Sequence, residues 1–254
     1  MTTPRPSLSQ PPWWALVSST GAVVTLVGGW VSAAAVQRPG YDPVQMTISA
    51  LARHGADHRW VMTAALYAVG ACHLITAAGL RGLPQRSRSL LALGGAAGLG
   101  LGAFAQPEHG STDGHLAFVV LGLVTMAVWP LTVGSRTATS FPLRLRDAVL
   151  SGLLSVLLLA WLVSALSGTT LGLAERAVTF QQELRPLLVV LALRRQGRLV
   201  SVVAGEAGEW RSPPVRDSAP AMKRGRPLPL ALLSESEQTL GAREQSKSAG
   251  KMTS

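Results

Sequence analysis

The sequence predicts an all-α polytopic membrane protein, a bundle of six transmembrane helices with a disordered cytoplasmic C-terminal tail. Charged residues make up only 14% of the 254 residues, and the mean hydropathy is positive at +0.30. Five apolar runs are each long enough to cross a hydrocarbon core of roughly 30 Å at about 1.5 Å per residue. Since these runs are apolar on all sides, they are not typical of surface helices of a soluble protein. The runs cover residues 13–36, 60–80, 89–106, 115–134 and 148–168.

The first run requires a choice between a retained helix and a cleaved signal peptide. Ala33 and Ala35 form an A-x-A pattern that is typical of a signal-peptidase site. The apolar part of a signal peptide is about 7–15 residues long, however, and this run is longer. The sequence therefore favours a retained first helix.

The second run contains the single cysteine, Cys72, next to His73. One cysteine excludes a disulfide within the chain and any CxxC motif. An intramembrane histidine is compatible with a proton relay. The interpretation we favour from the sequence is a neutral imidazole hydrogen-bonded to a neighbouring carbonyl.

The third run carries Gly94, Gly98 and Gly102, which form two overlapping GxxxG repeats. Glycines at this spacing let the backbone of a neighbouring helix approach closely. We expect the third helix to be tightly packed.

The sixth span, residues 173–193, is the most polar. Six of its residues, most of them polar, fall within one arc of about 120° when the segment is drawn as a helix. They are Glu175, Arg176, Thr179, Gln182, Glu183 and Pro186. Ionisable groups at membrane depth are costly, so this stripe is expected to face protein or water. The alternative is an interfacial lead-in to a short helix that begins near Pro186.

Orientation follows from the basic residues in the connections between spans. One side holds Arg5, the basic C-terminal tail and the two connections that follow the second and fourth spans. These two connections contain most of the arginines found between spans. The positive-inside rule places this side, with both termini, in the cytoplasm. We expect a multi-pass protein of the plasma membrane.

The connections on the outer side carry most of the unusual polar chemistry. We expect a polar cluster between the outer ends of the second, fourth and sixth helices, formed by Asp42, Ser49, His115, Glu175 and Arg176. Such a cluster is suited to binding a lipid headgroup or small solute, or to serving a transporter. It is equally suited to holding the helices together. A transporter usually has two repeated halves with broken helices at corresponding positions. The sequence does not show such a pair, so transport has little support.

A membrane-embedded hydrolase acting on a lipid, assisted by a metal, is a further alternative. His54 and His58 are four residues apart, which on a helix places both on one face, and His109 and His115 offer further ligands. Ser49 would then act as nucleophile or polarise bound water. The sequence contains no H-E-x-x-H and no G-x-S-x-G motif. It therefore identifies no catalytic residue and predicts no metal or cofactor.

Several short motifs, in order, resemble a known family. They are Tyr41-Asp42-Pro43, Thr47-Ile48-Ser49-Ala50-Leu51, Gln106-Pro107-Glu108-His109 followed by His115, and Gly172-Leu173-Ala174-Glu175-Arg176. Together they resemble the bacterial and archaeal family named domain of unknown function 998, over residues 13–195. The resemblance implies an integral membrane protein of six or seven helices and brings no established activity.

These observations divide the chain into a short cytoplasmic tail (1–12), a membrane domain (13–195) and a disordered basic tail (196–254). The net charge is +10, but 11 of the 23 Lys and Arg residues follow Leu193. This distribution favours contact with the membrane surface over nucleic acid. The lipid bilayer is the expected partner, with a lipid or small solute as the candidate ligand, and the sequence does not predict an oligomeric state.

Overall fold

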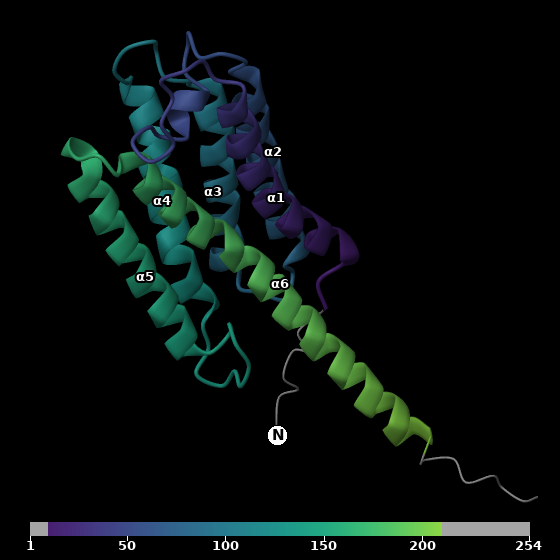
Figure 1. The fold of residues 1–254 in the computed structure, drawn as a ribbon. Coiled ribbons are helices and arrows are strands. Elements are labelled where there is room, and N and C mark those ends of the chain that lie inside the picture. Colours follow the sequence, from purple (N-terminus) through teal and green to yellow (C-terminus); the bar gives the residue numbers. More distant parts are fainter. Residues whose placement is uncertain (1–9, 210–254) are drawn as a thin grey trace, which may run out of the picture. The chain divides into compact units, whose positions relative to one another are not determined.

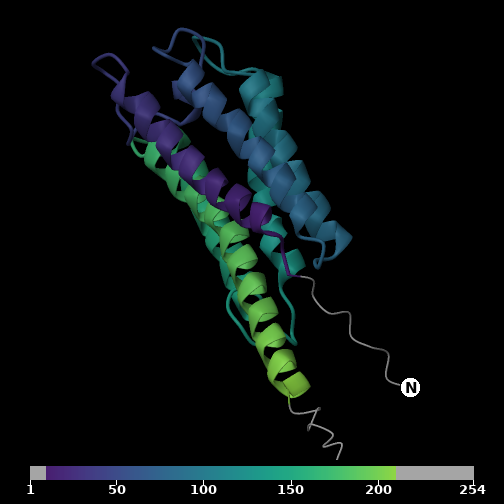
Figure 2. The same cartoon turned by 90° about the vertical axis from the view of Figure 1, so that its right-hand side faces the viewer.

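The computed structural model describes residues 10–209, and this part of the chain is helical without any β-strand. The helices are α1 (Trp13–Ala35), α2 (Trp60–Gly79), α3 (Gln85–Ala103), α4 (Asp113–Val133), α5 (Leu145–Ser164) and α6 (Leu171–Glu209), with short 3₁₀ helices η1 (Ser49–Leu51) and η2 (Ala165–Ser167). From α1 to α5, each helix packs against the next along the chain, and α6 runs obliquely across the bundle (Figures 1 and 2). The predicted all-α fold is confirmed.

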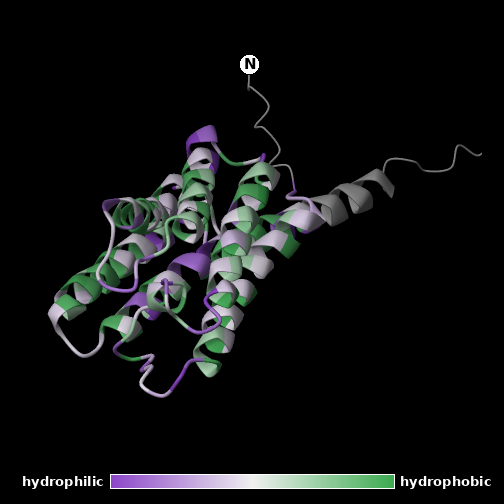
Figure 3. Ribbon diagram, turned by 90° about the horizontal axis from the view of Figure 1, so that it is seen from above, coloured by the Kyte–Doolittle hydropathy of each residue, from purple (hydrophilic) through white to green (hydrophobic). Residues whose placement is uncertain are grey.

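Four helices of the described chain, α1, α2, α4 and α5 together with η2, are long and apolar enough to span a membrane. Helix α5 shows why their surroundings must be apolar. Its buried positions are the small Ala148, Ser151, Gly152 and Ser155, whereas Leu150 and Leu157 are 62% and 67% exposed. A helix in water would bury its leucines and expose its serines. In Figure 3, apolar residues lie along the helices, and the most hydrophilic ones are concentrated toward the connections.

Helix α3 is held closest to α2. A Cβ atom on Gly95 would lie 2.8 Å from the carbonyl oxygen of Gly70, and one on Gly98 would lie 3.2 Å from the Gly70 Cα. The predicted tight packing of the third helix is therefore present, although Gly95, outside the GxxxG repeats, makes the closest approach. Gly94 faces α4 instead, where its Cβ would lie 2.9 Å from Met126 Sδ.

Helix α6 is attached by side-chain hydrogen bonds along most of its length. Gln181 bonds to Ser155 of α5 (2.8 Å), Gln182 donates to the Leu123 carbonyl of α4 (3.1 Å), and Arg194 donates to the Pro11 carbonyl (2.6 Å). The helix continues past the expected boundary at residue 195, because no proline or glycine pair interrupts it before Glu209. The rest of the predicted disordered tail, residues 210–254, lies outside the described residues.

One region of the bundle is densely packed, and we call it the packed region. At its centre, Trp129 of α4 is fully buried and its indole Nε1 donates to the Ser87 carbonyl (2.8 Å). The Ser87 hydroxyl in turn donates to the Thr132 carbonyl (2.9 Å). The apolar residues around this network are Ala77, Leu80, Leu83, Leu91, Met126, Val133, Leu143, Val189, Val190, Ala192 and Leu193.

Candidate functional site

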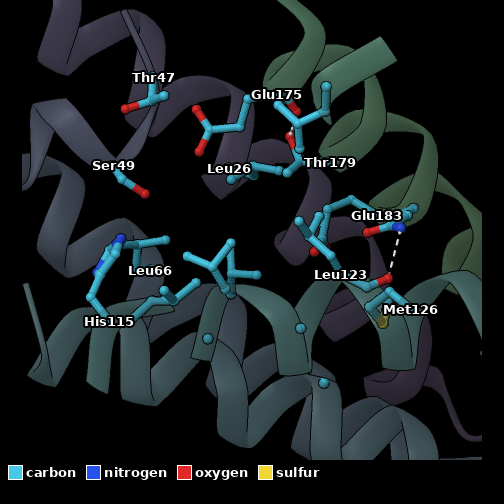
Figure 4. A pocket seen from close by; sticks show the side chains of 18 of the residues that line it. Leu26, Thr47, Ser49, Leu66, His115, Leu123, Met126, Glu175, Thr179 and Glu183 are labelled. Atoms are coloured by element: carbon cyan, nitrogen blue, oxygen red, sulfur yellow. Dashed lines mark hydrogen bonds between the residues drawn. The ribbon is translucent and has the colours of Figure 1, made fainter. Parts of the chain in front are cut away.

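A cavity of about 300 Å³ lies among the helices and is lined mainly by apolar side chains. Polar residues from distant parts of the sequence also line it. They are Thr47, Ser49, His73, Gln106, His115, Glu175, Thr179, Gln182 and Glu183. In Figure 4, Ser49, His115 and Glu175 surround one part of the cavity, and Glu183 lies beyond Thr179 in another. Four residues of the predicted stripe on α6 thus face a cavity inside the bundle.

Ser49 and Glu175 reach the cavity because the loop before α2 is fastened to α6. The amide of Ile48, which precedes η1, donates a hydrogen bond to the Glu175 carboxylate, and Ser49 interacts with the same carboxylate. A carboxylate that accepts backbone N–H groups is well stabilised in a protein interior. Glu175 therefore fixes the position of Ser49 as well as lining the cavity.

His115 enters the cavity wall from the first turn of α4. Thr112 caps this helix, since its hydroxyl oxygen accepts from the His115 amide at 3.2 Å. The imidazole is 2% exposed, and its Nδ1 lies 2.8 Å from the Phe104 carbonyl oxygen. Because a carbonyl only accepts, Nδ1 is assigned the proton. In the neutral ring Nε2 is then an acceptor, and this buried atom has no partner within the described part of the protein.

Arg176 and Tyr41 fasten the loop and do not line the cavity. The Arg176 guanidinium donates to the carbonyls of Pro43 (2.8 Å) and Met46 (2.9 Å), and to the Tyr41 hydroxyl. Burial raises the pKa of the Tyr41 phenol above its ordinary value, and the charge of Arg176 offsets part of that rise. Arg176 does not form an ion pair with Glu175 in the described structure.

In the described structure, the Asp42 carboxylate makes no hydrogen bond to the other predicted cluster residues. Its carboxylate accepts from the Val44 amide (2.8 Å) and from the Gln45 side chain (2.7 Å), within its own loop. These hydrogen bonds, with that of Val44 the strongest, lower the pKa of Asp42 below its ordinary value. The residue stabilises a turn and is not part of the cavity wall.

The histidines suggested as metal ligands do not share the geometry that the hypothesis requires. Residues 52–59 form turns, with His58 at a φ of 48°, so the helix that would align His54 with His58 does not form. His54 Nδ1 instead lies 3.3 Å from Arg59, and His109 lies in the exposed loop between α3 and α4. Within residues 10–209, no group of three or more His, Cys, Asp and Glu side chains is placed to hold a metal ion.

The structure also joins two buried groups that the sequence did not pair. His73 Nε2 of α2 lies 2.9 Å from Glu183 Oε1 of α6, and the two residues are 2% and 8% exposed. The expected carbonyl partner of His73 is therefore wrong, because a carboxylate occupies that place. The sequence placed both residues at membrane depth. It did not reveal how α2 and α6 are rotated relative to each other, and this rotation decides whether the two side chains meet.

The family model described as a protein of unknown function, DUF998, matches residues 12–193, a range that includes every residue lining the cavity. The chain belongs to the DUF998 family. The resemblance inferred from the ordered motifs is thus confirmed, and together with the apolar helices it identifies a membrane protein of this family. No curated protein and no solved structure matches this family member significantly.

The chemistry available in the cavity is mainly the acceptance of hydrogen bonds. His115 Nε2 and Glu183 Oε2 are buried acceptors without protein partners, and none of the described lining residues is Lys or Arg. Ser49 interacts with the Glu175 carboxylate, and within the described chain no hydrogen bond links it to His115. The unpartnered acceptors can receive hydrogen bonds from a bound molecule.

Proposed function

We propose that this protein binds a small amphiphilic molecule in the cavity, with a hydrogen-bond donor of the ligand at Ser49, His115 and Glu175. The observation that carries the proposal is the buried, unpartnered Nε2 of His115 in the wall of a largely apolar cavity. An unsatisfied buried polar atom costs roughly 1–3 kcal/mol. A ligand hydroxyl or ammonium group would remove that cost while its hydrocarbon part fills the apolar space.

The size of the cavity restricts the ligand. A water molecule occupies about 30 Å³ in the liquid, so 300 Å³ corresponds to about ten such volumes. This lies at the lower end of the range for small-molecule pockets. The cavity suits a small solute, or a lipid headgroup with the first part of its chain, rather than a whole phospholipid.

We propose further that all six helices cross the plasma membrane, with residues 1–12 and the basic segment that follows α6 in the cytoplasm. The arginines near α3 and α5 support this orientation, which places Ser49 and His115 near the outer face. In a Cys72→Ser background, an impermeant maleimide should label Ser111→Cys in intact cells, and Thr137→Cys only after permeabilisation. The reverse pattern would invert the proposed orientation.

The binding proposal is tested with 1-octanol, which carries one hydroxyl on a hydrocarbon chain. The protein in lipid nanodiscs should show a rise in Tm that depends on octanol concentration, as expected for a ligand of the folded state. His115→Asn retains a donor near the Phe104 carbonyl and removes the Nε2 acceptor. We expect it to weaken octanol binding at least tenfold, while His109→Asn, in the exposed loop, does not.

Equal octanol affinities in wild type, His115→Asn and His109→Asn would contradict binding at His115. The absence of any saturable rise in Tm in the wild type would reject binding of such amphiphiles in the cavity altogether.

A further inference from the structure

The pair formed by His73 and Glu183 leaves polar atoms unused. Each residue contributes one atom to their contact, and the other atoms, His73 Nδ1 and Glu183 Oε2, are buried without a partner among the described residues. Both residues line the same cavity as Ser49, His115 and Glu175. The cavity therefore has a second polar part, contributed by α2 and α6, with its own unsatisfied groups.

The proton count shows what this pair offers to a ligand. Buried in apolar surroundings, the pair is most stable with no net charge, which requires a single proton between Nε2 and Oε1. If that proton is on His73, the ring is an imidazolium and Nδ1 also carries hydrogen. If it is on Glu183, Nε2 accepts and the ring's hydrogen is again on Nδ1. In both cases Nδ1 is a donor and Glu183 Oε2 is an acceptor, and if the carboxyl proton is on Oε2 with Nε2–H donating to Oε1, the two roles are exchanged. The neutral pair therefore always offers a ligand one donor and one acceptor, which a hydroxyl group can satisfy.

The spacing of the two polar parts follows from α6. Glu175 and Glu183 are eight residues apart on this helix, which corresponds to about 12 Å along the axis at 1.5 Å per residue. Between these two glutamates on α6, Thr179 and Gln182 also line the cavity, but they donate to the backbone carbonyls of Glu175 (2.8 Å) and Leu123 (3.1 Å). The rest of the wall is mainly apolar and includes Leu66, Val69, Leu101, Val119 and Leu123. A ligand that satisfies both parts must carry hydrocarbon between two polar ends.

We propose that the ligand is a linear molecule with a hydrogen-bonding group at each end of a short hydrocarbon chain. One end binds at Ser49, His115 and Glu175, and the other binds at His73 and Glu183. This inference rests on the proposed binding function and defines its ligand class. An extended chain gains about 1.2 Å per bond, so the nine bonds between the oxygens of 1,8-octanediol span about 11 Å.

The test compares 1,8-octanediol with 1-octanol in nanodiscs, using the double variant His73→Phe/Glu183→Met. Replacing both partners of a buried polar pair by apolar groups of similar size is far less disruptive than removing one. The matched control is His109→Phe/Glu108→Met, which makes the same two replacements in an exposed loop. Each alcohol is compared with itself across variants, so that its partitioning into lipid cancels.

We expect the double variant in the cavity to weaken binding of the diol at least tenfold and to leave octanol unchanged or tighter. The control variant should change neither affinity. If the double variant binds the diol as tightly as wild type does, or loses the same fraction of affinity for both alcohols, the two-ended ligand is wrong. Octanol binding to wild type would still support the proposed function. If neither alcohol binds to wild type, the proposed function itself fails.

Discussion

The packed region around Trp129 and the cavity lie in the same helix bundle, but they differ in whether their buried polar atoms have hydrogen-bond partners. In the packed region, the indole of Trp129 and the hydroxyl of Ser87 both donate to backbone carbonyls. In the cavity, His115 Nε2 and Glu183 Oε2 have no partner within the described residues. Other buried atoms also lack a partner there, such as Arg185 Nε and Asp147 Oδ2, but their residues do not line this cavity. Unsatisfied groups are costly in a membrane, and those of the cavity are placed where a ligand can satisfy them. The contrast agrees with the proposal that the first region serves stability and the second serves binding.

Side-chain size explains how one bundle contains both regions. Trp129, Leu91 and the α6 valines fill the packed region. Three glycines, Gly94 and Gly98 of α3 and Gly122 of α4, contribute to the cavity wall. A Cβ on Gly94 or Gly98 would come closer than an ordinary contact to Met126 or to Gly70 of α2, whereas a Cβ on Gly122 would make only an ordinary contact with Ala97, so Gly122 is the glycine that leaves space at the wall.

The comparison predicts its largest effect for Trp129→Ala. Truncating a fully buried tryptophan costs about 3–5 kcal/mol and removes the indole hydrogen bond to the Ser87 carbonyl. The free energy of unfolding in detergent should fall by about that amount, while Trp13→Ala, at a residue that is 69% exposed, should change it by less than about 1 kcal/mol. A similar loss for the two variants would refute the distinction between packed and exposed tryptophans.

A smaller effect is predicted at the contact between α2 and α3. Gly95→Ala places a Cβ 2.8 Å from the Gly70 carbonyl oxygen, so the helices must separate, at a cost of about 1–3 kcal/mol. The control is Gly28→Ala, where a Cβ meets nothing within 4 Å and helix propensity favours alanine by up to about 1 kcal/mol. Thermal unfolding of the two variants should therefore shift in opposite directions, and a shared direction would count against the close contact.

The smallest effect on binding is predicted for Asp42→Asn, because Asp42 lies outside the cavity wall. Octanol affinity should match that of the wild type. Since folding lowers the pKa of Asp42 from 3.8, its contribution to stability is present above that value and is lost as the pH falls through the lower folded value. The variant should therefore lose less stability than wild type as the pH is lowered. A change in its octanol affinity would contradict the placement of Asp42 outside the cavity wall.

The sequence predicted the elements more completely than the site. The apolar runs predicted the helices, and the glycines of α3 predicted one tight contact. Both predictions were possible because the patterns are local in the sequence. The stripe on α6 correctly indicated an inward face. The separation of Asp42 from Ser49, and the pairing of His73 with Glu183, depend on loop paths and helix rotation. These are set by packing between distant segments, so spacing along the chain does not reveal them.

The claim that the cavity is a binding site is tested most directly by filling it. Gly122 lies in its wall, and a Cβ added there makes only an ordinary contact, 3.5 Å from Ala97 Cβ. The measurement is octanol affinity of Gly122→Leu against Gly28→Leu, each with its Tm in the absence of octanol. The account predicts at least a tenfold loss of affinity for Gly122→Leu, with its Tm no lower than that of the control. Unchanged octanol affinity in Gly122→Leu would contradict it.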